Sequence, residues 1–479
     1  MLPSPLTILA AVVVAFFVVL AVARGPVDAD YWWHLETGRL ILERGGVPST
    51  DPFSFAYDGP WVAHEWMGEV LIAVLVTGIG YAPTAALFGV AAAGSLLAPA
   101  VAIHRRGISV RALAPWLVVG TYILASFATV RPQVLSWLLL GVLLVLLLGM
   151  RAEQRIRPWL VIPLMAVWAN LHGLWVVGVA VVAIYAAFTL LGRTPLAPRR
   201  WTAVGMLIGA VVASGLTPAG PAGLLYPLRY LRQDDWGTSF IAEWQPADFT
   251  DPRQWGVAIL IIAVILLVRR GAPGWLTAVA IAGCVGALIA VRNAPLAAVM
   301  ALPMLATALD ARLRPTTHRS ASSARPRRLL ELGIAAAVVA AIAIVLPPAI
   351  GQAENEVFPA TAMDRLVEAD ADARALVDYD WGGWAIHRLH ESGGSVFIDG
   401  RSDMYPRTIF EDYRAIRSAE PGWPDLAREY GVEAILLRTA APLVRADDRP
   451  GWCEVHRDLR AVLLLPCDQA ATSGRSGSS

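Results

Sequence analysis

Long apolar runs separated by arginine-containing loops dominate this 479-residue chain. A run of about 17–25 apolar residues is long enough to cross a bilayer as a helix. The sequence contains about eleven such candidates, near residues 5–23, 82–103, 112–129, 133–150, 158–170, 174–191, 202–217, 255–269, 275–291, 294–309 and 329–348. The run at 67–80 is short and close to the next span, so we interpret it as an interfacial or re-entrant helix. The pattern predicts a mainly α-helical, polytopic membrane protein.

The composition agrees with a membrane protein and excludes two other classes. Only 16% of the residues are charged and the mean hydropathy is +0.55, whereas soluble domains contain roughly 25% charged residues. The 39 basic residues are all arginines and almost balance 38 acidic ones, for a net charge of +1. This balance excludes a basic nucleic-acid binder. Three cysteines are too few for a disulfide scaffold.

The distribution of charge predicts the orientation. Arginine clusters lie in the loops with Arg105, Arg106 and Arg111; Arg151, Arg155 and Arg157; Arg193, Arg199 and Arg200; Arg269 and Arg270; and residues 312–328. The positive-inside rule makes these loops cytoplasmic, with the N-terminus inside and the C-terminus outside. The outer segments 24–69 and 349–479 then carry net charges of −5 and −8, and the remainder carries +14. Residues 21–23 also resemble a signal-peptide cleavage site, but residue 24 onward emerges outside in either case.

This topology brings the unusual polar motifs to the outer face. They are Asp28-Ala-Asp30-Tyr-Trp-Trp-His34, Thr50-Asp51-Pro-Phe-Ser54, His64-Glu65, Arg131-Pro-Gln133, Asn170-Leu-His172, Glu243-Trp244 and Arg292-Asn293. Ionisable residues at membrane depth are costly and mark functional sites. Arg131 and Arg292 are exceptions to the inner preference of arginine. Two cations among carboxylates suit an anionic lipid head group together with a general base.

Each motif also has a structural explanation. The tryptophans of the first outer loop suit an aromatic belt at the membrane interface, and the histidines suit interfacial hydrogen bonds. Arg131 and Arg292 could form structural ion pairs. Asp30 and His34 share one face of a helix and could hold a metal, but two ligands do not define a metal site. The sequence therefore indicates no metal site, and any cofactor stays unknown.

The C-terminal region predicts a small extracytoplasmic α/β domain over residues 349–469, followed by a disordered tail at 470–479. Its predicted strands are 395–398, 433–437 and 461–465, and its predicted helices are 361–369, 382–390 and 424–430. Cys453 and Cys467 flank a predicted hairpin with its turn at 458–461, so we expect a disulfide in an oxidising compartment. Residues 1–348 form the predicted membrane domain, with outer loops at 24–69 and 219–254.

The first-loop run D-A-D-Y-W-W-H-L-E-T-G-R-L-I-L, with T-D-P-F-S and W-V-A-H-E-W, resembles a group of bacterial GT-C-type glycosyltransferases. The later R-P-Q, N-L-H-G, E-W-Q-P, W-G-G-W and F-I-D-G-R-S-D are similar to that group as well. Relatives such as protein O-mannosyltransferases carry a catalytic aspartate just after the first span, often as Asp-Glu. The resemblance therefore implies catalysis by Asp28 or Asp30, although the pattern here is Asp-Ala-Asp.

The resulting hypothesis is an inverting membrane glycosyltransferase that moves a sugar from a polyprenyl-phosphate donor to a cell-envelope acceptor at the outer face of the cytoplasmic membrane. The expected substrate-binding residues are His34, His64, Glu65, Arg131, Gln133, Asn170, His172, Glu243, Arg292 and Asn293. The alternatives are a non-catalytic protein that binds, transports or assembles lipid-linked glycans on the same scaffold, and a polymerase or ligase acting on a lipid diphosphate. Span interiors almost free of charge argue against transport.

Overall fold

The computed structural model describes residues 4–151, 153, 157–226, 241–269, 271–313 and 357–473. The predicted span at 329–348, the loop residues Asp234 and Asp235, and the last six residues of the tail lie outside this set. The described chain divides into two compact units. Unit 1 contains residues 4–24 and most of 79–313, and unit 2 contains residues 25–78 and 357–473.

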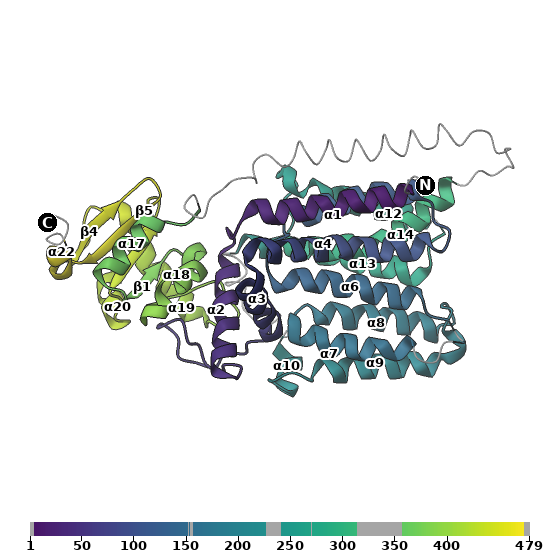
Figure 1. Cartoon of the computed structure of the whole chain (residues 1–479), viewed down its shortest axis with the longest axis horizontal. Coiled ribbons are helices and arrows are strands. Elements are labelled where there is room, and N and C mark those ends of the chain that lie inside the picture. The colour runs from purple at the N-terminus through teal and green to yellow at the C-terminus, as the bar shows by residue number, and fades with distance from the viewer. Residues whose placement is uncertain are drawn as a thin grey trace. The chain divides into compact units, whose positions relative to one another are not determined.

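Unit 1 is a bundle of helices (Figure 1). Its main helices are α1 (Pro5–Arg24), α4 (Tyr81–His104), α5 (Val110–Ala125), α6 (Pro132–Leu148), α7 (Val161–Leu171), α8 (Trp175–Leu190), α9 (Arg200–Ser214), α12 (Trp255–Leu267), α13 (Gly274–Ile289) and α14 (Ala294–Leu313). Shorter helical turns are η1 (Arg157–Leu160), η2 (Ala197–Arg199), α10 (Pro221–Leu225), η4 (Ala242–Trp244), η5 (Pro252–Gln254) and η6 (Val291–Asn293).

Each apolar run predicted between residues 5 and 309 is a helix in the structure, including α3 (Trp66–Ile79) at the predicted interfacial segment. By length and composition, three described segments can cross a membrane: Pro5–Arg24, Tyr81–His104 and Val291–Leu313. Seven more apolar helices are shorter than 18 residues. The predicted count of about eleven spans is therefore not confirmed.

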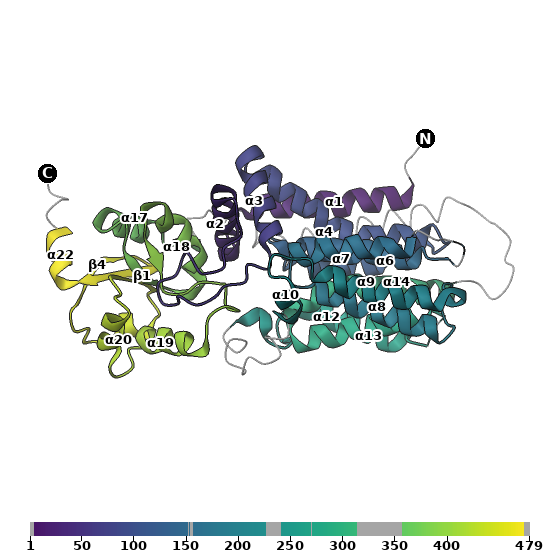
Figure 2. The ribbon, with the colours of Figure 1, turned by 90° about the horizontal axis from the view of Figure 1, so that it is seen from below.

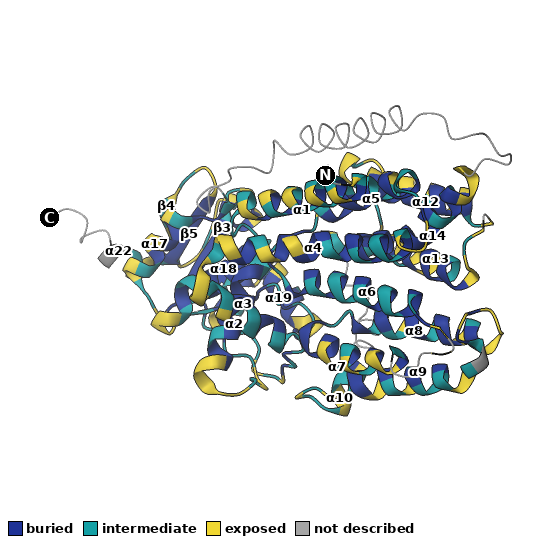
Figure 3. Ribbon diagram, turned by 45° about the vertical axis from the view of Figure 1, so that its right-hand side comes forward, coloured by how far each residue is buried: buried dark blue, intermediate teal, exposed yellow. Residues whose placement is uncertain are grey.

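Small residues allow the helices of unit 1 to pack closely. Helix α4 packs against α1 and α6, and α14 packs against α5 and α13. A Cβ atom on Gly89 of α4 would lie 2.6 Å from the carbonyl oxygen of Phe17, and one on Gly141 of α6 would lie 2.6 Å from that of Ser95. Glycine at such contacts lets backbones approach in membrane helix pairs. The alanine-rich α14 is buried along most of its length (Figure 3).

Unit 2 is built on a five-stranded sheet with the strand order β2-β1-β3-β5-β4. The strands are β1 (Arg374–Val377), β2 (Ser395–Val396), β3 (Ala434–Arg438), β4 (Trp452–Arg457) and β5 (Ala461–Pro466). Strands β2, β1 and β3 are parallel, and β5 and β4 continue the sheet antiparallel. A disulfide joins Cys453 at the start of β4 to Cys467 just after β5, with their Cα atoms 4.9 Å apart.

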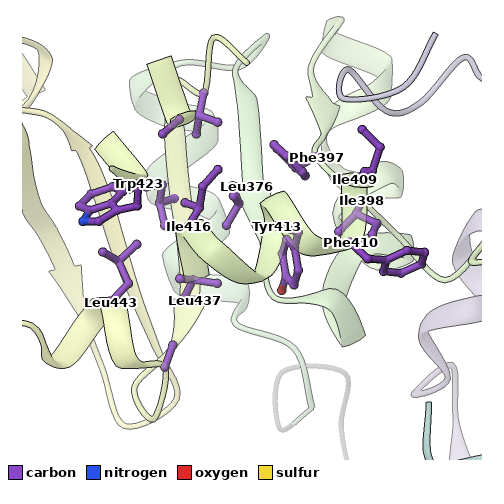
Figure 4. Close-up of a cluster of buried hydrophobic side chains, with 14 of the residues drawn as sticks. Leu376, Phe397, Ile398, Ile409, Phe410, Tyr413, Ile416, Trp423, Leu437 and Leu443 are labelled. Carbon is purple, nitrogen blue, oxygen red and sulfur yellow. The ribbon is translucent and has the colours of Figure 1, made fainter. Parts of the chain in front are cut away.

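Helices cover both faces of this sheet. The helices are α2 (Ala29–Arg44), α17 (Ala360–Ala369), η8 (Tyr379–Trp381), α18 (Gly382–Leu389), η9 (His390–Ser392), α19 (Arg407–Arg417), α20 (Trp423–Glu429), α21 (Pro442–Arg445) and α22 (Cys467–Ser473). Figure 2 shows α17 and α18 on one face and α19 and α20 on the other. The core under α19 and α20 joins side chains such as Leu376, Phe397, Tyr413 and Trp423 (Figure 4).

The segment predicted as the first outer loop is part of unit 2 from residue 25 onward. The backbone N–H of Phe55 donates to the carbonyl of Val396, and that of Val396 donates to the carbonyl of Phe53, both at 3.0 Å. Ser54 thus forms a parallel bridge with Val396 at the edge of the sheet. Trp61 belongs to the same hydrophobic core. This grouping differs from the sequence-based division at residue 348, because residues far apart in the chain share one sheet and one core.

Candidate active site

Asp28 and Asp30 have different positions at the start of helix α2. Asp28 is the N-cap, and its Oδ1 accepts a hydrogen bond from the backbone N–H of Asp30 at 3.0 Å. Aspartate is a favoured N-cap residue because its carboxylate satisfies an otherwise unpaired helical N–H. Asp30 lies in the first turn, and its Oδ1 accepts a hydrogen bond from Nε1 of Trp33 at 3.1 Å. The structure therefore assigns a local structural role to Asp28.

The carboxylate of Asp30 lies beside the loop that follows β2. A Cβ atom on Gly400 would lie 2.2 Å from Oδ1 of Asp30 and 3.2 Å from Nε1 of Trp33, so only glycine fits there without a shift. Burial raises the pKa of Tyr379 well above its usual range, and the negative charge of Asp30 raises it further. Tyr379 follows β1 and Gly400 follows β2. Asp30 thus lies at the carboxyl ends of two parallel strands, where α/β sheets bind ligands. We call Asp30, Trp33, Tyr379 and Gly400 the Asp30 site.

Three predicted residues, His34, His64 and Glu65, meet in a second group. Nε2 of His34 lies 3.6 Å from Oε2 of Glu65, and Nε2 of His64 lies 3.3 Å from Oε1 of the same residue. Glu69 and Asp403 complete the group: Glu69 Oε1 lies 3.5 Å from His34 Nδ1, and Asp403 Oδ2 lies 3.9 Å from His64 Nδ1. We call these five residues the histidine–carboxylate cluster.

The charges of this cluster favour a protonated His64. Burial alone would lower the pKa of His64, but the hydrogen bond and charge of Glu65 and the charge of Asp403 outweigh it and raise the pKa to about 9. Burial raises the pKa of the Asp403 carboxyl, with His64 acting in the opposite direction. The cluster therefore holds a positive imidazolium among carboxylates at neutral pH.

A third group, the Arg401 network, joins the first loop to the segment after β2. The guanidinium of Arg401 is buried and donates to both Asp51 and Asp399, with its shortest contact at 2.6 Å. Tyr405 also donates to Asp399 at 2.6 Å. The Arg401 guanidinium lies over the rings of Phe53 and Trp61. The network therefore joins T-D-P-F-S, which supplies Asp51, to F-I-D-G-R-S-D, which supplies Asp399 and Arg401.

In unit 1, the structure brings together Arg131, Glu243 and Arg292. Arg131 directly precedes α6, and its Nη1 lies 3.3 Å from Oε1 of Glu243. The charge of Arg131 lowers the pKa of the Glu243 carboxyl, and Arg292 contributes in the same direction. The guanidinium of Arg292 lies 4.2 Å from the ring centroid of Trp244. This arginine group places two guanidinium groups beside Glu243, and guanidinium groups are the side chains that bind carboxylate and phosphate through paired hydrogen bonds.

The other predicted residues of unit 1 make local contacts. The Asn170 amide donates to the carbonyls of Ala166 and Leu216, both at 2.8 Å. Nδ1 of His172 accepts from the N–H of Leu174 at the start of α8. The Asn293 amide donates to the carbonyl of Gly286 at 3.1 Å. These hydrogen bonds fix helix ends. Gln133 is buried in the first turn of α6.

Sequence reasoning missed Glu69, Tyr379 and the position of Asp403 beside His64. Glu69 offers one signal, because it lies one helical turn after Glu65 and is the only acid in the apolar helix α3. Tyr379 and Asp403 lie more than 300 positions from their neighbours in the first loop, and no local pattern links them. No group of three or more His, Cys, Asp or Glu residues in the described ranges is arranged to hold a metal ion.

Two solved glycosyltransferase structures resemble this chain. The archaeal oligosaccharyltransferase AglB from Archaeoglobus fulgidus, in complex with an inhibitory peptide and a dolichol-phosphate, matches with a TM-score of 0.63 and 12% identity, over 91% of this chain and 69% of AglB. The arabinofuranosyltransferase AftD from mycobacteria matches with a TM-score of 0.57 and 16% identity, over 95% of this chain and 40% of AftD. No protein-family model and no curated protein sequence matches this chain.

Both neighbours are GT-C glycosyltransferases. The chain has the GT-C fold. The resemblance expected from the first-loop motif is thus confirmed at the level of the fold, which is mainly helical with a small C-terminal sheet. The GT-C fold and its apolar helices make this a membrane protein. The chain spans well under half the length of AftD.

Proposed function

We propose that this protein transfers a sugar from a polyprenyl-phosphate donor to a cell-envelope acceptor at the outer face of the cytoplasmic membrane, with inversion at the anomeric carbon. The GT-C fold supports sugar transfer from a lipid carrier. AglB is described with a bound dolichol-phosphate, which is a polyprenyl-type phosphate. In this proposal the N-terminus is cytoplasmic, the spans number about eleven, and residues 24–69 and 349–469 are extracytoplasmic.

Asp30 is the general base of the proposed reaction, and the Asp30 site is the observation that carries this assignment. The Asp28 carboxylate is engaged as a helix cap. The Asp30 carboxylate lies at the carboxyl ends of β1 and β2, next to the phenol of Tyr379. A protonated tyrosine can donate a hydrogen bond to a sugar hydroxyl while the carboxylate accepts a proton. The indole N–H of Trp33 donates to the same carboxylate at 3.1 Å and holds it in place.

The reaction consists of one displacement. Asp30 takes the proton from an acceptor hydroxyl as its oxygen forms a bond to the anomeric carbon. The bond from that carbon to the phosphate oxygen breaks on the opposite face, and the electron pair leaves with polyprenyl phosphate. An attack from the face opposite the leaving group inverts the anomeric configuration. The phosphate is a weak base, so it needs charge stabilisation more than a proton.

The arginine group of unit 1 suits the phosphate of the donor. Arg131 lies 3.3 Å from Glu243, and both Arg131 and Arg292 lower the pKa of that carboxyl, so the two guanidinium groups lie near the same point. Guanidinium groups bind phosphate through paired hydrogen bonds and keep their charge at any physiological pH. In this proposal the two arginines stabilise the negative charge that develops on the leaving phosphate.

The decisive experiment compares Asp30→Asn with Asp28→Asn in a transfer assay that uses a labelled polyprenyl-phosphate sugar. Asparagine caps helices as well as aspartate does, so Asp28→Asn keeps the helix start. We expect Asp30→Asn to lose about 10²–10⁴-fold in rate, the usual contribution of a general base. Asp28→Asn should keep most of the activity. A dead Asp28→Asn enzyme with an active Asp30→Asn enzyme reverses the assignment.

A second arm of the experiment measures donor binding. Arg131→Ala should weaken binding of the labelled donor, whereas Arg253→Ala should not, because Arg253 is exposed and pairs with Asp251. Equal donor affinity in both variants argues against the phosphate role. If the normal protein binds the donor but transfers no sugar to any acceptor extract, the non-catalytic binding or transport alternative replaces our proposal.

A further inference from the structure

The loops at one end of unit 1 form two adjoining cavities that open to the surface, far along the helices from Arg131 and Arg292. The larger has a volume of about 440 Å³ and is lined by the end of α6, the loop after α8 and the start of α13. The second, of about 410 Å³, adds Met150, Arg151 and Glu153. Arg106, Leu148 and Pro195 line both cavities. We call the two together the arginine cavity.

The polar lining of the arginine cavity is strongly cationic. Arg106, Arg151 and Arg193 face one carboxylate, that of Glu153. None of these three guanidinium groups lies within 4 Å of a carboxylate elsewhere in the part of the chain that the structure describes. Burial lowers the pKa of Arg106, and the charges of Arg151 and Arg157 lower it further. Gathering like charges is unfavourable, so the cavity gains from a bound anion.

The remaining lining is largely apolar. It includes Leu147, Leu148, Met150 and the ring of Trp275, next to the buried hydroxyl of Thr194. A free inorganic anion would make no favourable contact with this apolar surface. Three guanidinium groups beside aliphatic and aromatic walls match a phosphodiester attached to a glycerol backbone and acyl chains. Basic pockets between the ends of membrane helices bind acidic phospholipid head groups in this way.

Arg157 differs from the cavity arginines and shows what a purely structural arginine does here. Its Nη2 donates to the carbonyl of Val145 at 3.1 Å and its Nε donates to that of Leu146 at 3.3 Å, at the end of α6. Its guanidinium covers Gly149. Arg157 thus caps a helix, whereas Arg106, Arg151 and Arg193 make no such contacts in the described structure. We propose that the arginine cavity binds the phosphate of an anionic phospholipid head group, a site independent of sugar transfer.

The test uses the full-length protein, purified and delipidated in a neutral detergent. Native mass spectrometry measures binding of short-chain phosphatidylglycerol and of the matched phosphatidylcholine to the normal protein, Arg106→Gln, Arg193→Gln and Arg105→Gln. Arg105 is the matched control, because it is an exposed neighbour in the same loop and lines neither cavity. Arg105→Gln removes one positive charge from the same loop as Arg106→Gln does, so the two variants differ only in whether the lost side chain lines the cavity.

We expect the normal protein to prefer phosphatidylglycerol, and Arg106→Gln to weaken that binding about tenfold, the usual effect of losing one charge-assisted hydrogen bond. Arg193→Gln should act in the same direction, and Arg105→Gln should bind within about twofold of the normal protein. Either cavity variant suffices if the other fails to fold. Three results overturn the proposal: equal binding of both lipids, an equal loss in Arg105→Gln, or displacement of the lipid by inorganic phosphate alone.

Discussion

Arg401 neutralises two buried carboxylates that come from different parts of the chain. Asp51 comes from the first loop and Asp399 from the end of β2, and neither side chain has exposed surface. Removing one partner of a buried ion pair leaves an uncompensated charge in a low-dielectric interior. A substitution at Arg401 should therefore cost much more folding stability than one at a surface arginine.

We expect Arg401→Met to destabilise unit 2 by about 3–5 kcal/mol. The matched control is Arg407→Met, because Arg407 is half-exposed and pairs with Glu411 on the surface of α19. Loss of that pair should cost less than about 1 kcal/mol. Thermal unfolding of the two purified variants measures the difference. Similar melting temperatures contradict a central role for the Arg401 network.

His64 makes the stability of unit 2 depend on pH. Its pKa is about 9 in the folded protein and 6.5 in the unfolded chain. A group with a raised pKa stabilises the fold fully below its unfolded pKa and loses that effect as the pH rises through its folded pKa. We therefore expect stability to fall between pH 6.5 and 9, by up to about 3 kcal/mol. The melting temperature should depend less on pH across this range in His64→Gln than in the normal protein. A slope that persists in the variant assigns the effect to another group.

Local patterns in the sequence predicted the elements that are long or strongly apolar. The apolar helices α1, α3 to α9 and α12 to α14, the strands β2, β3 and β5 and the helices α17, α18 and α20 match predicted segments within a few residues. Strand β4 matches the first strand of the hairpin predicted between Cys453 and Cys467, whereas strand β1 and helix α19 were not predicted. Strand β1 has four residues, too few for a recognisable alternation. Helix α19 is rich in arginine and acid, and only its buried face joins the core.

The sequence predicted single residues of the candidate site, but it did not predict which distant residues contact them. The Asp30, His34, His64 and Glu65 side chains were singled out by their motifs, and local spacing explains the cap of Asp28. The partners Tyr379, Gly400 and Asp403 belong to a sheet whose pairing with the first loop is set by backbone hydrogen bonds at Phe53 and Phe55. Such long-range pairing leaves no periodic signature, so the sequence could not reveal it.

The contact between α2 and α18 provides a test at a single glycine. A Cβ atom on Gly383 would lie 2.1 Å from the carbonyl oxygen of Ala29 and 3.0 Å from Trp33. Gly383→Ala therefore forces α2 away from α18, which should cost about 1–3 kcal/mol and reduce sugar transfer by moving Asp30. Gly46→Ala is the control, since nothing lies within 4 Å of its added Cβ. Unchanged activity and stability in Gly383→Ala would show that the two helices are not held together.

Unit 2 is a discontinuous domain, assembled from residues 25–78 and 357–473 among its described parts. We expect residues 357–473 alone to lack cooperative unfolding, because Asp51 and Trp61 are missing from the Arg401 network and the core. A peptide of residues 47–64 added to this fragment should restore a cooperative unfolding transition. The same peptide with Asp51→Ala should have little effect, and circular dichroism measures both. Full stability without the peptide contradicts the discontinuous domain.

The pairing of Ser54 with Val396 also determines when unit 2 can fold during synthesis, because its sheet cannot be completed until Val396 has been made. Residues 79–350 stand between the two main segments of unit 2 and must be synthesised first. At about 5–20 residues per second, the ribosome needs roughly a quarter of a minute to a minute for that stretch. During this delay Asp51 lacks its ion-pair partner Arg401, and the backbone around Phe53 lacks its hydrogen-bond partner Val396. A nascent chain that stalls in this interval exposes a half-built sheet edge, which makes it a natural target for chaperones and quality-control proteases.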